Sequence, residues 1–355
     1  MKILIVGICG FVGNALALEL KRRVEDVEII GLDNLSRPGS ERNRDHLKQQ
    51  DICFRHGDIR NPSDLEDLPK VDWVIDAAAS PSVLAGVSGP TSSRQLMEHN
   101  LIGTINLLEY CKRHGAGLVM LSTSRVYSAS RLSALPMEVK NEAFVPRWSE
   151  AREPGLSPKG VAEEFSTEPP LSLYGSAKRA SELLILEYGL AFDLPVYVNR
   201  CGVLAGAGQF GRPDQGIFAF WIHSYHRKEP LKYIGFDGAG HQVRDCLHPR
   251  DLASLIAAQM RRPERAGRAL NVGGGVANSM SLAQLSEWCA CRFGRMEIKS
   301  DSVPRHYDVP WLVLDSARAA TEWDWRPATK LESILDEIAR HAELHPEWLD
   351  LSDGL

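Results

Sequence analysis

The chain has 355 residues, of which 44% are hydrophobic and 25% are charged, and its formal net charge is −5. This length exceeds what one hydrophobic core usually holds, so we expect two lobes or one large α/β domain with an appendage. The mildly acidic balance provides no basic surface for nucleic acid or for an anionic membrane. No apolar run approaches the roughly 18 residues of a membrane span, and the N-terminal run is too short for a signal peptide. The seven cysteines form no CxxC pair, which predicts a cytoplasmic protein with reduced thiols.

Short apolar runs alternate with helical patterns along the first half of the chain. Strands are expected at 3–6, 28–32, 53–57, 73–76 and 118–121, and helices at 12–24 and 97–112. Strands that alternate with helices pair in parallel, and nearly continuous apolar strands fit a sheet that is covered on both faces. The sequence therefore predicts an α/β fold with a Rossmann-type doubly wound parallel sheet over residues 1–200.

This alternation stops at residues 129–170, where prolines and charges are frequent. We expect this insert to be a long loop or lid, because loops of this length in compact domains are often functional. A helix over 171–192 and a strand over 195–198 follow. Residues 201–355 are expected to form mainly a smaller C-terminal lobe that is partly interwoven with the first domain. Further helices are expected at 252–261 and 282–293.

Three glycines, Gly7, Gly10 and Gly13, lie between the first expected strand and the first expected helix. A tight glycine turn lets the backbone approach a pyrophosphate, and the following helix N-terminus offers it unpaired N–H groups. The second expected strand ends at Asp33, 20 residues after Gly13. A carboxylate there binds the ribose hydroxyls of NAD and repels a 2′-phosphate, whereas the nearby Arg37 is a residue type that accommodates NADP. We favour NAD; the alternative for Asp33 is a turn cap.

Tyr174 and Lys178 are four residues apart, so on a helix their side chains share a face. A tyrosine with a pKa of about 10 is a poor base at neutral pH, but a neighbouring ammonium group favours the phenolate and makes it an acid/base candidate. Ser122 and Thr123 follow the fifth expected strand, at the sheet edge where ligands bind in open α/β folds. The alternatives are a helix pair at a lobe interface for Tyr174 and Lys178, and simple capping for the two hydroxyls.

Two patterns have a spacing that is also found in metal sites. His341 and His345 are four residues apart but lack the adjacent Glu of the metalloprotease motif. Cys289 and Cys291 lie two apart on an expected helix, where such residues face in different directions. We therefore expect no metal site.

The motifs occur in an order that resembles the extended short-chain dehydrogenase/reductases, specifically their nucleotide-sugar epimerases and dehydratases. The resemblance covers essentially the whole chain. Besides the glycine turn and the Tyr174–Lys178 pair, it is carried by Asp33-Asn34-Leu35-Ser36, Gly57-Asp58-Ile59-Arg60, Ala77-Ala78-Ala79, Asn100 to Glu109, Ser122 to Tyr127, Arg244-Asp245 and Asn271-Val272-Gly273-Gly274.

The resemblance implies a role for each matching residue. Tyr174 is similar to the proton shuttle of the family, Lys178 to the residue that lowers its pKa and holds the nicotinamide ribose, and Thr123 to the residue that binds the reacting hydroxyl. The expected NAD-binding residues are Gly7, Gly10, Phe11, Val12, Gly13, Asp33, Asn34, Arg37, Asp58, Ile59, Ala77, Ala78, Ala79, Asn100, Ser122, Tyr174, Lys178, Arg200, Cys201 and Val203. The expected residues for a nucleotide-diphosphate sugar are Thr123, Gln209, Gln215, Arg244, Arg305 and Asp308.

Departures from the family pattern narrow the expected reaction. Dehydratases carry Asp-Glu after the catalytic Thr, whereas this chain has Ser124 and Arg125, so elimination is not expected. The second half is similar to the CDP-paratose 2-epimerases through Gly208-Gln209-Phe210, Asp214-Gln215-Gly216, Gly240 to Asp245 and Asn278 to Leu282. The alternatives are a nucleotide-sugar 4-epimerase, a reductase, or a non-catalytic NAD-binding regulator. The insert at 129–170 is expected to shape the sugar or base pocket.

The resemblance also implies a homodimer, built through a four-helix bundle from the helices near 100–112 and 172–190. An apolar helix stripe fits internal packing equally well.

Overall fold

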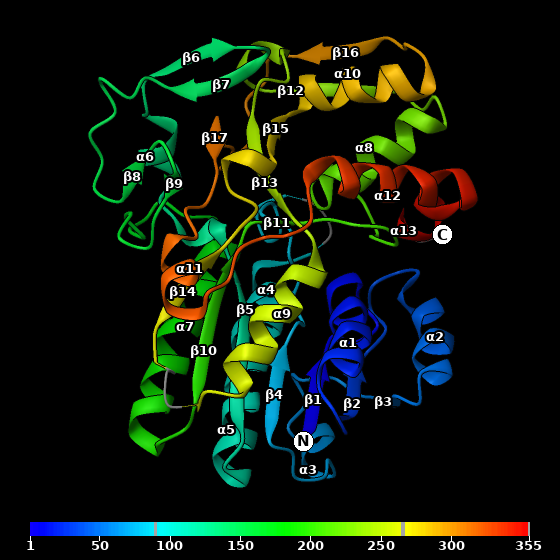
Figure 1. Ribbon diagram of the computed structural model, residues 1–355, viewed down its shortest axis with the longest axis vertical. Helices are drawn as coiled ribbons and strands as arrows, with labels where there is room; N and C mark the ends of the chain where they lie inside the picture. Colours follow the sequence, from blue (N-terminus) through cyan, green and yellow to red (C-terminus); the bar gives the residue numbers. More distant parts are fainter. Residues whose placement is uncertain (89–90, 264–266, 354–355) are drawn as a thin grey trace.

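The computed structural model describes residues 1–88, 91–263 and 267–353. At its centre lies a seven-stranded sheet in which all neighbouring strands run parallel (Figure 1). From one edge to the other, the strands are β14 (Ala269–Val272), β10 (Val196–Cys201), β5 (Gly117–Thr123), β4 (Trp73–Asp76), β1 (Lys2–Val6), β2 (Glu28–Asp33) and β3 (Cys53–His56). The predicted doubly wound parallel sheet is confirmed.

Helices cover both faces of the sheet because its strands are apolar on both sides. Successive side chains of a strand point to opposite faces, so Ile3 and Ile5 pack into one apolar cluster while Leu4 and Val6 pack into the other. The first layer contains α1 (Phe11–Arg23), α2 (Asn43–Gln49), α9 (Pro249–Met260) and α11 (Ala317–Trp323). The second contains α3 (Ser63–Glu66), α5 (Gly103–His114) and α7 (Leu173–Phe192), with α4 (Ser93–Met97) and the π-helical turn η2 (Glu98–Ile102) leading into α5.

A smaller lobe lies beyond the carboxyl ends of the sheet strands (Figure 1). Its strands are β11 (Val203–Leu204), β13 (Val243–Leu247), β15 (Ser279–Ser281) and β17 (Trp311–Leu312) in one small sheet, and β12 (Leu231–Ile234) with β16 (Ile298–Asp301) in another. Its helices are α8 (Ile217–His226), α10 (Leu282–Phe293), α12 (Leu331–Leu344) and α13 (Trp348–Asp353). The chain crosses between the lobes repeatedly, since α9, β14 and α11 return to the large sheet after residue 200.

The insert at 129–170 is folded, so the expectation of a long loop is wrong. It contains α6 (Ala129–Ser133) and two hairpins, β6 (Met137–Lys140) with β7 (Ala143–Pro146) and β8 (Leu156–Ser157) with β9 (Gly160–Val161). Leu132, Val161 and Phe165 are buried in a cluster with Trp311 and Leu314 of the second lobe. Strands of two to four residues carry too short an alternation to stand out in a sequence that is rich in proline and charge.

Short 3-10 turns complete the chain: η1 (Ser40–Arg42), η3 (Ser124–Val126), η4 (Phe236–Gly238) and η6 (Val276–Asn278). Among the described residues, no helix has the length and apolar character needed to cross a membrane.

Candidate active site

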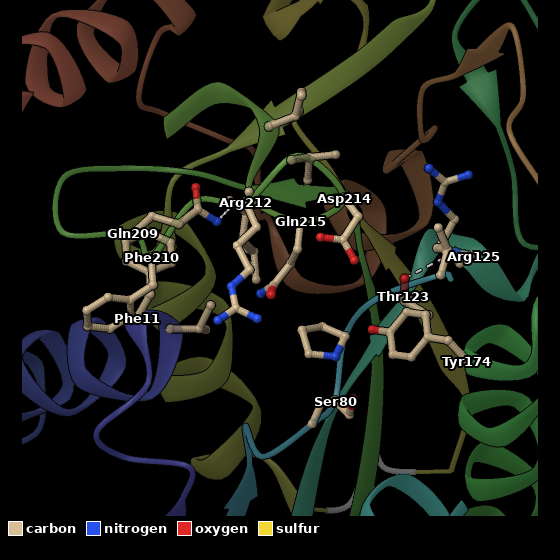
Figure 2. Close-up of a pocket in the computed structure, with 18 of the residues that line it drawn as sticks. Phe11, Ser80, Thr123, Arg125, Tyr174, Gln209, Phe210, Arg212, Asp214 and Gln215 are labelled. Carbon is tan, nitrogen blue, oxygen red and sulfur yellow. Dashed lines mark hydrogen bonds between the residues drawn. The ribbon is translucent and has the colours of Figure 1, made fainter. Parts of the chain in front are cut away.

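A cavity of about 830 Å³ lies between the carboxyl edge of the large sheet and the second lobe. The glycine turn forms one end, and residues 305–308 of the second lobe line the other. Figure 2 shows Thr123, Arg125 and Tyr174 together on one side, and Gln209 and Phe210 with Phe11 on the opposite side. Ligands of open α/β sheets bind at this edge of the strands.

The glycine turn has a geometry that other residues do not tolerate. Gly7 has a φ of +74°, and a Cβ placed on Gly13 lies 2.2 Å from the carbonyl oxygen of Gly7. The N-cap of α1 is Gly10, so no side chain caps the helix, and its first N–H groups lie at the cavity. A helix N-terminus of this kind binds a pyrophosphate through backbone N–H groups and the helix dipole. The residues therefore fit a dinucleotide.

Asp33 lies at the end of β2, beside this turn. Its carboxylate accepts hydrogen bonds from the backbone N–H of Cys9 at 2.9 Å and of Leu35 at 2.8 Å. Burial raises the pKa of the Asp33 carboxyl, and these two N–H groups oppose that rise. The guanidinium of Arg37 donates to Gln215 at 2.7 Å and to the carbonyl of Phe210. Asp33 thus has the position that suits the two ribose hydroxyls of NAD.

A second carboxylate, Asp58, lies next along this end of the cavity. Arg60 contacts it at 2.6 Å, and the amide of Asn34 donates to it at 2.8 Å. Burial raises the pKa of Asp58, but the hydrogen bonds from Arg60 and Asn34 outweigh burial, and the net effect holds its pKa below the usual value. Asp58 is therefore ionised and fixed in place.

Thr123, Tyr174 and Lys178 meet in the middle of the cavity. Thr123 is the last residue of β5, and Tyr174 and Lys178 lie on the first two turns of α7. The N-cap of this helix is Ser172, whose hydroxyl accepts a hydrogen bond from the N–H of Gly175 at 3.0 Å. In Figure 2 the Thr123 side chain lies beside the Tyr174 phenol, and the Thr123 hydroxyl acts to lower the pKa of Tyr174. Tyr174 is 8% exposed and Lys178 is 2% exposed. Burial raises the pKa of Tyr174 to about 12, so the phenol needs a compensating positive charge to act as a base near neutral pH.

The second lobe contributes positive groups to the far end. Arg244 donates to Asp308 at 2.8 Å, and Arg305 donates to the carbonyl of Pro213 at 3.2 Å. Gln209 belongs to the other end, beside Phe11 (Figure 2), and its amide nitrogen donates to the carbonyl of Leu204 at 2.8 Å. Two guanidinium groups at one end of a cavity suit an anion such as a diphosphate.

The structure gathers all but two of the residues predicted from the sequence around this cavity. The two that do not line it are Asn100 and Arg200. Asn100 is buried and pairs with the backbone of Ser80, accepting from its N–H at 2.8 Å and donating to its carbonyl at 3.0 Å, so it supports the cavity wall from behind. Arg200 lies in a buried ion pair with Glu182 at 2.8 Å. In sequence, a charge near the end of a sheet strand resembles a ligand contact, whereas the partner of Arg200 is Glu182 on α7.

The insert does not shape the cavity, contrary to the expectation from its length. Every residue of 129–170 is described, and none lines the cavity. Its apolar residues are held instead by the cluster with Trp311 and Leu314.

Sequence reasoning missed part of the cavity wall at Ser80, Phe210, Arg212 and Asp214. Asp214 accepts a short hydrogen bond from Ser82, which joins the two segments that face each other across the cavity. The sequence does mark this segment, because a glycine lies at each end of the run from Gly208 to Gly216. Only Gln209 and Gln215 of this run were predicted to bind the substrate.

Comparisons with known proteins agree with this geometry. Residues 3–273 match the NAD dependent epimerase/dehydratase family. The chain is 28% identical to a CDP-paratose 2-epimerase from Salmonella typhi, with 92% of this chain and 95% of the relative covered. It is also 28% identical to a UDP-glucuronate 4-epimerase from Thermodesulfobacterium geofontis, with 94% and 93% covered. The fold is similar to the solved structure of Pal from Bacillus thuringiensis, with a TM-score of 0.80, 24% identity, and 97% and 99% of the two chains covered.

Proposed function

The chain belongs to the NAD dependent epimerase/dehydratase family and is an NAD-dependent enzyme, and we propose that it epimerises a nucleotide-diphosphate sugar in the manner of a CDP-paratose 2-epimerase. One observation carries the choice of epimerisation: the cavity contains the Thr123–Tyr174–Lys178 group, but position 125 beside it is an arginine. An arginine has no proton to give or take near neutral pH. The site thus provides Tyr174 as an acid/base group for a hydroxyl, and neither of the two residues that follow Thr123, Ser124 and Arg125, is a carboxylate that could remove water.

The proposed mechanism uses Tyr174 twice. Bound NAD supplies a site that accepts a hydride from the sugar carbon and returns it. Thr123 holds the reacting hydroxyl, and Tyr174 takes the hydroxyl proton as the carbon becomes a ketone. After the keto-sugar turns its other face, Tyr174 returns the proton to the same oxygen. Lys178 favours the phenolate between these steps.

The residues at the far end of the cavity fit the nucleotide part of such a substrate. Arg244 and Arg305 would hold the diphosphate, with Asp308 fixing the direction of the Arg244 guanidinium at 2.8 Å. Gln209 and Gln215 would contribute amide contacts to the sugar or the base. The similarity to the CDP-paratose 2-epimerase supports a cytidine nucleotide and reaction at C2.

We also propose that the protein is a homodimer in the cytoplasm. The helix α7 leaves Leu183, Leu190 and Phe192 exposed by 54%, 79% and 42% on the outside of the large lobe. α5 packs beside it, and Tyr188 of α7 donates to Glu109 of α5 at 2.7 Å. Two such helix pairs would bury these apolar side chains in a four-helix bundle. The seven cysteines are all unpaired, which fits a reducing compartment.

The test is turnover of CDP-, UDP-, GDP- and dTDP-sugars by the purified protein, first without added cofactor and then with added NADH. Formation of an epimer without accumulation of NADH supports the proposal. Consumption of added NADH in proportion to product would replace it with a reductase, and failure of every nucleotide sugar to react would favour the non-catalytic regulator. Tyr174→Phe is expected to retain NAD and lose activity. Tyr110→Phe is the matched control, because Tyr110 donates to the Pro69 carbonyl at 2.6 Å and does not line the cavity.

A further inference from the structure

Asp214 brings a negative charge to the cavity from the segment between Gly208 and Gly216. Its side chain is exposed at the cavity wall, and Figure 2 shows the carboxylate directed into the cavity on the side where Thr123 and Tyr174 lie. The two glycines that bound the segment have φ values of +77° and +72°, which residues with a Cβ rarely adopt. The backbone therefore turns sharply at both ends of the segment and presents the residues between them to the cavity.

A hydrogen bond from another part of the wall holds the Asp214 side chain. The hydroxyl of Ser82 accepts from the backbone N–H of Leu84 at 3.1 Å and donates its own proton to the carboxylate oxygen Oδ2 of Asp214. The next residue, Val83, packs against the apolar cluster that contains Tyr174. Ser82 thus connects Asp214 to the wall beside the proposed acid/base.

The other carboxylate oxygen of Asp214, Oδ1, faces the cavity without a protein donor. Within the part of the chain that the structure describes, the Ser82 hydroxyl is the one donor to this carboxylate, and no lysine, arginine or histidine nitrogen lies within 4.0 Å of it. The negative charge and one acceptor oxygen are therefore available to a ligand.

The cations Arg125 and Lys178, which line the cavity near Thr123, face opposing charges of their own. Asp308 attracts Arg125, and Figure 2 shows the Arg125 side chain turned away from the phenol. Burial raises the pKa of the Asp76 carboxyl, and the nearby ammonium group of Lys178 lowers it. Both positive charges are thus partly balanced by carboxylates outside the glycine-bounded segment.

Asp214 also lies between the two places where a nucleotide-diphosphate sugar would be held. The carbonyl of Pro213, the preceding residue, accepts from Arg305 at 3.2 Å, and Arg305 belongs to the end of the cavity that suits a diphosphate. On the other side, the hydrogen bond to Ser82 leads to the wall that carries Tyr174. A sugar is joined directly to the diphosphate, so a sugar whose hydroxyl reaches Tyr174 lies beside Asp214.

A carboxylate at this place discriminates between sugars by charge. Its oxygens accept hydrogen bonds and donate none, so they suit the hydroxyl groups of a neutral sugar. The sugar of a uronic acid carries its own carboxylate, which the Asp214 charge repels. Repulsion between two unit charges a few ångströms apart corresponds to about a tenfold loss of affinity.

We propose that Asp214 determines the class of nucleotide sugar that the cavity binds: it accepts a hydrogen bond from a hydroxyl of a neutral sugar and excludes sugars that carry a carboxylate. The inference rests on the proposed function, because it takes a nucleotide-diphosphate sugar as the ligand. It adds to that function the charge of the sugar.

The test compares two ligands that differ only at C6 of the sugar, UDP-glucose and UDP-glucuronate. Their dissociation constants are measured by isothermal titration calorimetry on the NAD-loaded protein, and the ratio of the two cancels the contribution of the shared nucleotide. We expect UDP-glucose to bind at least about tenfold more tightly, and Asp214→Asn to reduce this ratio by about tenfold. The same ratio in Asp214→Asn and in the unsubstituted protein would overturn the proposal.

Two control variants separate the charge of Asp214 from its structural contact. Ser82→Ala removes the hydrogen bond but keeps the charge, so it should alter both affinities alike and leave the ratio unchanged. A ratio that falls as much in Ser82→Ala as in Asp214→Asn would refute the role of the charge. Asp336→Asn is the matched charge control, because Asp336 pairs with Arg292 at 3.1 Å on α12 and does not line the cavity.

Binding and turnover distinguish this inference from the proposed function. If Asp214→Asn shifts the ratio but no nucleotide sugar is epimerised, the proposed function fails and the role of Asp214 stands. If an epimer forms and the ratio does not shift, the proposed function stands and the role of Asp214 fails. If neither UDP sugar binds, no sugar lies beside Asp214 and the inference is overturned.

Discussion

The buried network around Glu182 provides the strongest test of how the sheet and α7 are joined. Glu182 is fully buried, and its two carboxylate oxygens accept from Ser122 at 2.6 Å, from Arg200 at 3.0 and 2.8 Å, and from Arg179 at 3.1 Å. Ser122 is on β5, Arg200 is on β10, and Glu182 is one helical turn beyond Lys178. One carboxylate thus connects two strands with the helix that carries Tyr174.

Glu182→Gln removes the negative charge with little change in volume. The substituted amide faces Arg200 with a donor, so a guanidinium that is 5% exposed loses its counter-ion. Removing one partner of a buried ion pair costs about 3–5 kcal/mol, whereas an exposed pair is worth less than about 1 kcal/mol. A loss of this size is a large part of the roughly 5–15 kcal/mol that holds a domain folded.

Urea unfolding followed by circular dichroism measures this loss, with Glu153→Gln as the control because Glu153 pairs with Arg131 at the surface. A double-mutant cycle with Arg200→Met separates the ion pair from the rest of the network. The double variant is expected to be more stable than the sum of the single losses predicts, because it leaves no unpaired guanidinium. Equal losses in the free energy of unfolding for Glu182→Gln and Glu153→Gln would refute the structural role that we assign to the Glu182–Arg200 pair.

Three further predictions follow from the same coordinates. Gly13→Ala places a Cβ 2.2 Å from a backbone oxygen of its own turn, so the affinity for NAD should fall at least about tenfold; an unchanged amount of NAD retained on purification contradicts this. Gly175→Ala forces α7 away from Arg125 and should lower kcat by about a hundredfold while NAD is retained; a kcat within twofold of the original would be the contrary result. Burial first, and neighbouring histidines second, lower the pKa of His341 to about 4 and of its contact His223 to about 3. An unfolded histidine has a pKa of about 6.5, so the contribution of the two neutral histidines to stability is complete above that pH and is lost as the pH falls toward 4. His341→Gln should reduce the dependence of the free energy of unfolding on pH, measured by urea unfolding. An unchanged dependence would contradict the lowered pKa of His341.

The parts of the fold that were predictable are those whose signal is local. The strands β1, β4 and β5 are nearly continuous apolar runs because helices cover both of their faces, and each was placed within about two residues. The strand β14 was not predicted, since Ala269–Val272 is short, contains an asparagine and follows a long excursion of the chain. Its place in the sheet depends on pairing with β10, which no local pattern encodes.

The residues of the site also fall into two groups: those that a local sequence pattern predicts and those whose contacts depend on distant parts of the chain. The glycine turn, Asp33 and the Tyr174–Lys178 spacing depend on short stretches of backbone, so the sequence alone could predict that they line one cavity. The environment of Arg200 depends on Glu182, 18 residues away on another element. A charged residue next to a predicted site looks the same in sequence whether it contacts a ligand or a buried carboxylate, and only the packing distinguishes them.

The cavity wall at 209–216 is held in place by contacts with α13, near the C-terminal end of the chain. Phe210 stacks on Trp348 of α13 with ring centroids 5.2 Å apart, and the Trp348 indole donates to the carbonyl of Gln209 at 3.1 Å. Arg212 donates to the carbonyl of Ser352 at 2.7 Å. The helix α13 lines no part of the cavity, yet it fixes the segment that faces Thr123 and Tyr174. A substitution in α13 therefore reaches the cavity wall through three contacts, whereas the longer insert at 129–170 packs on Trp311 and Leu314 and lines no part of the cavity.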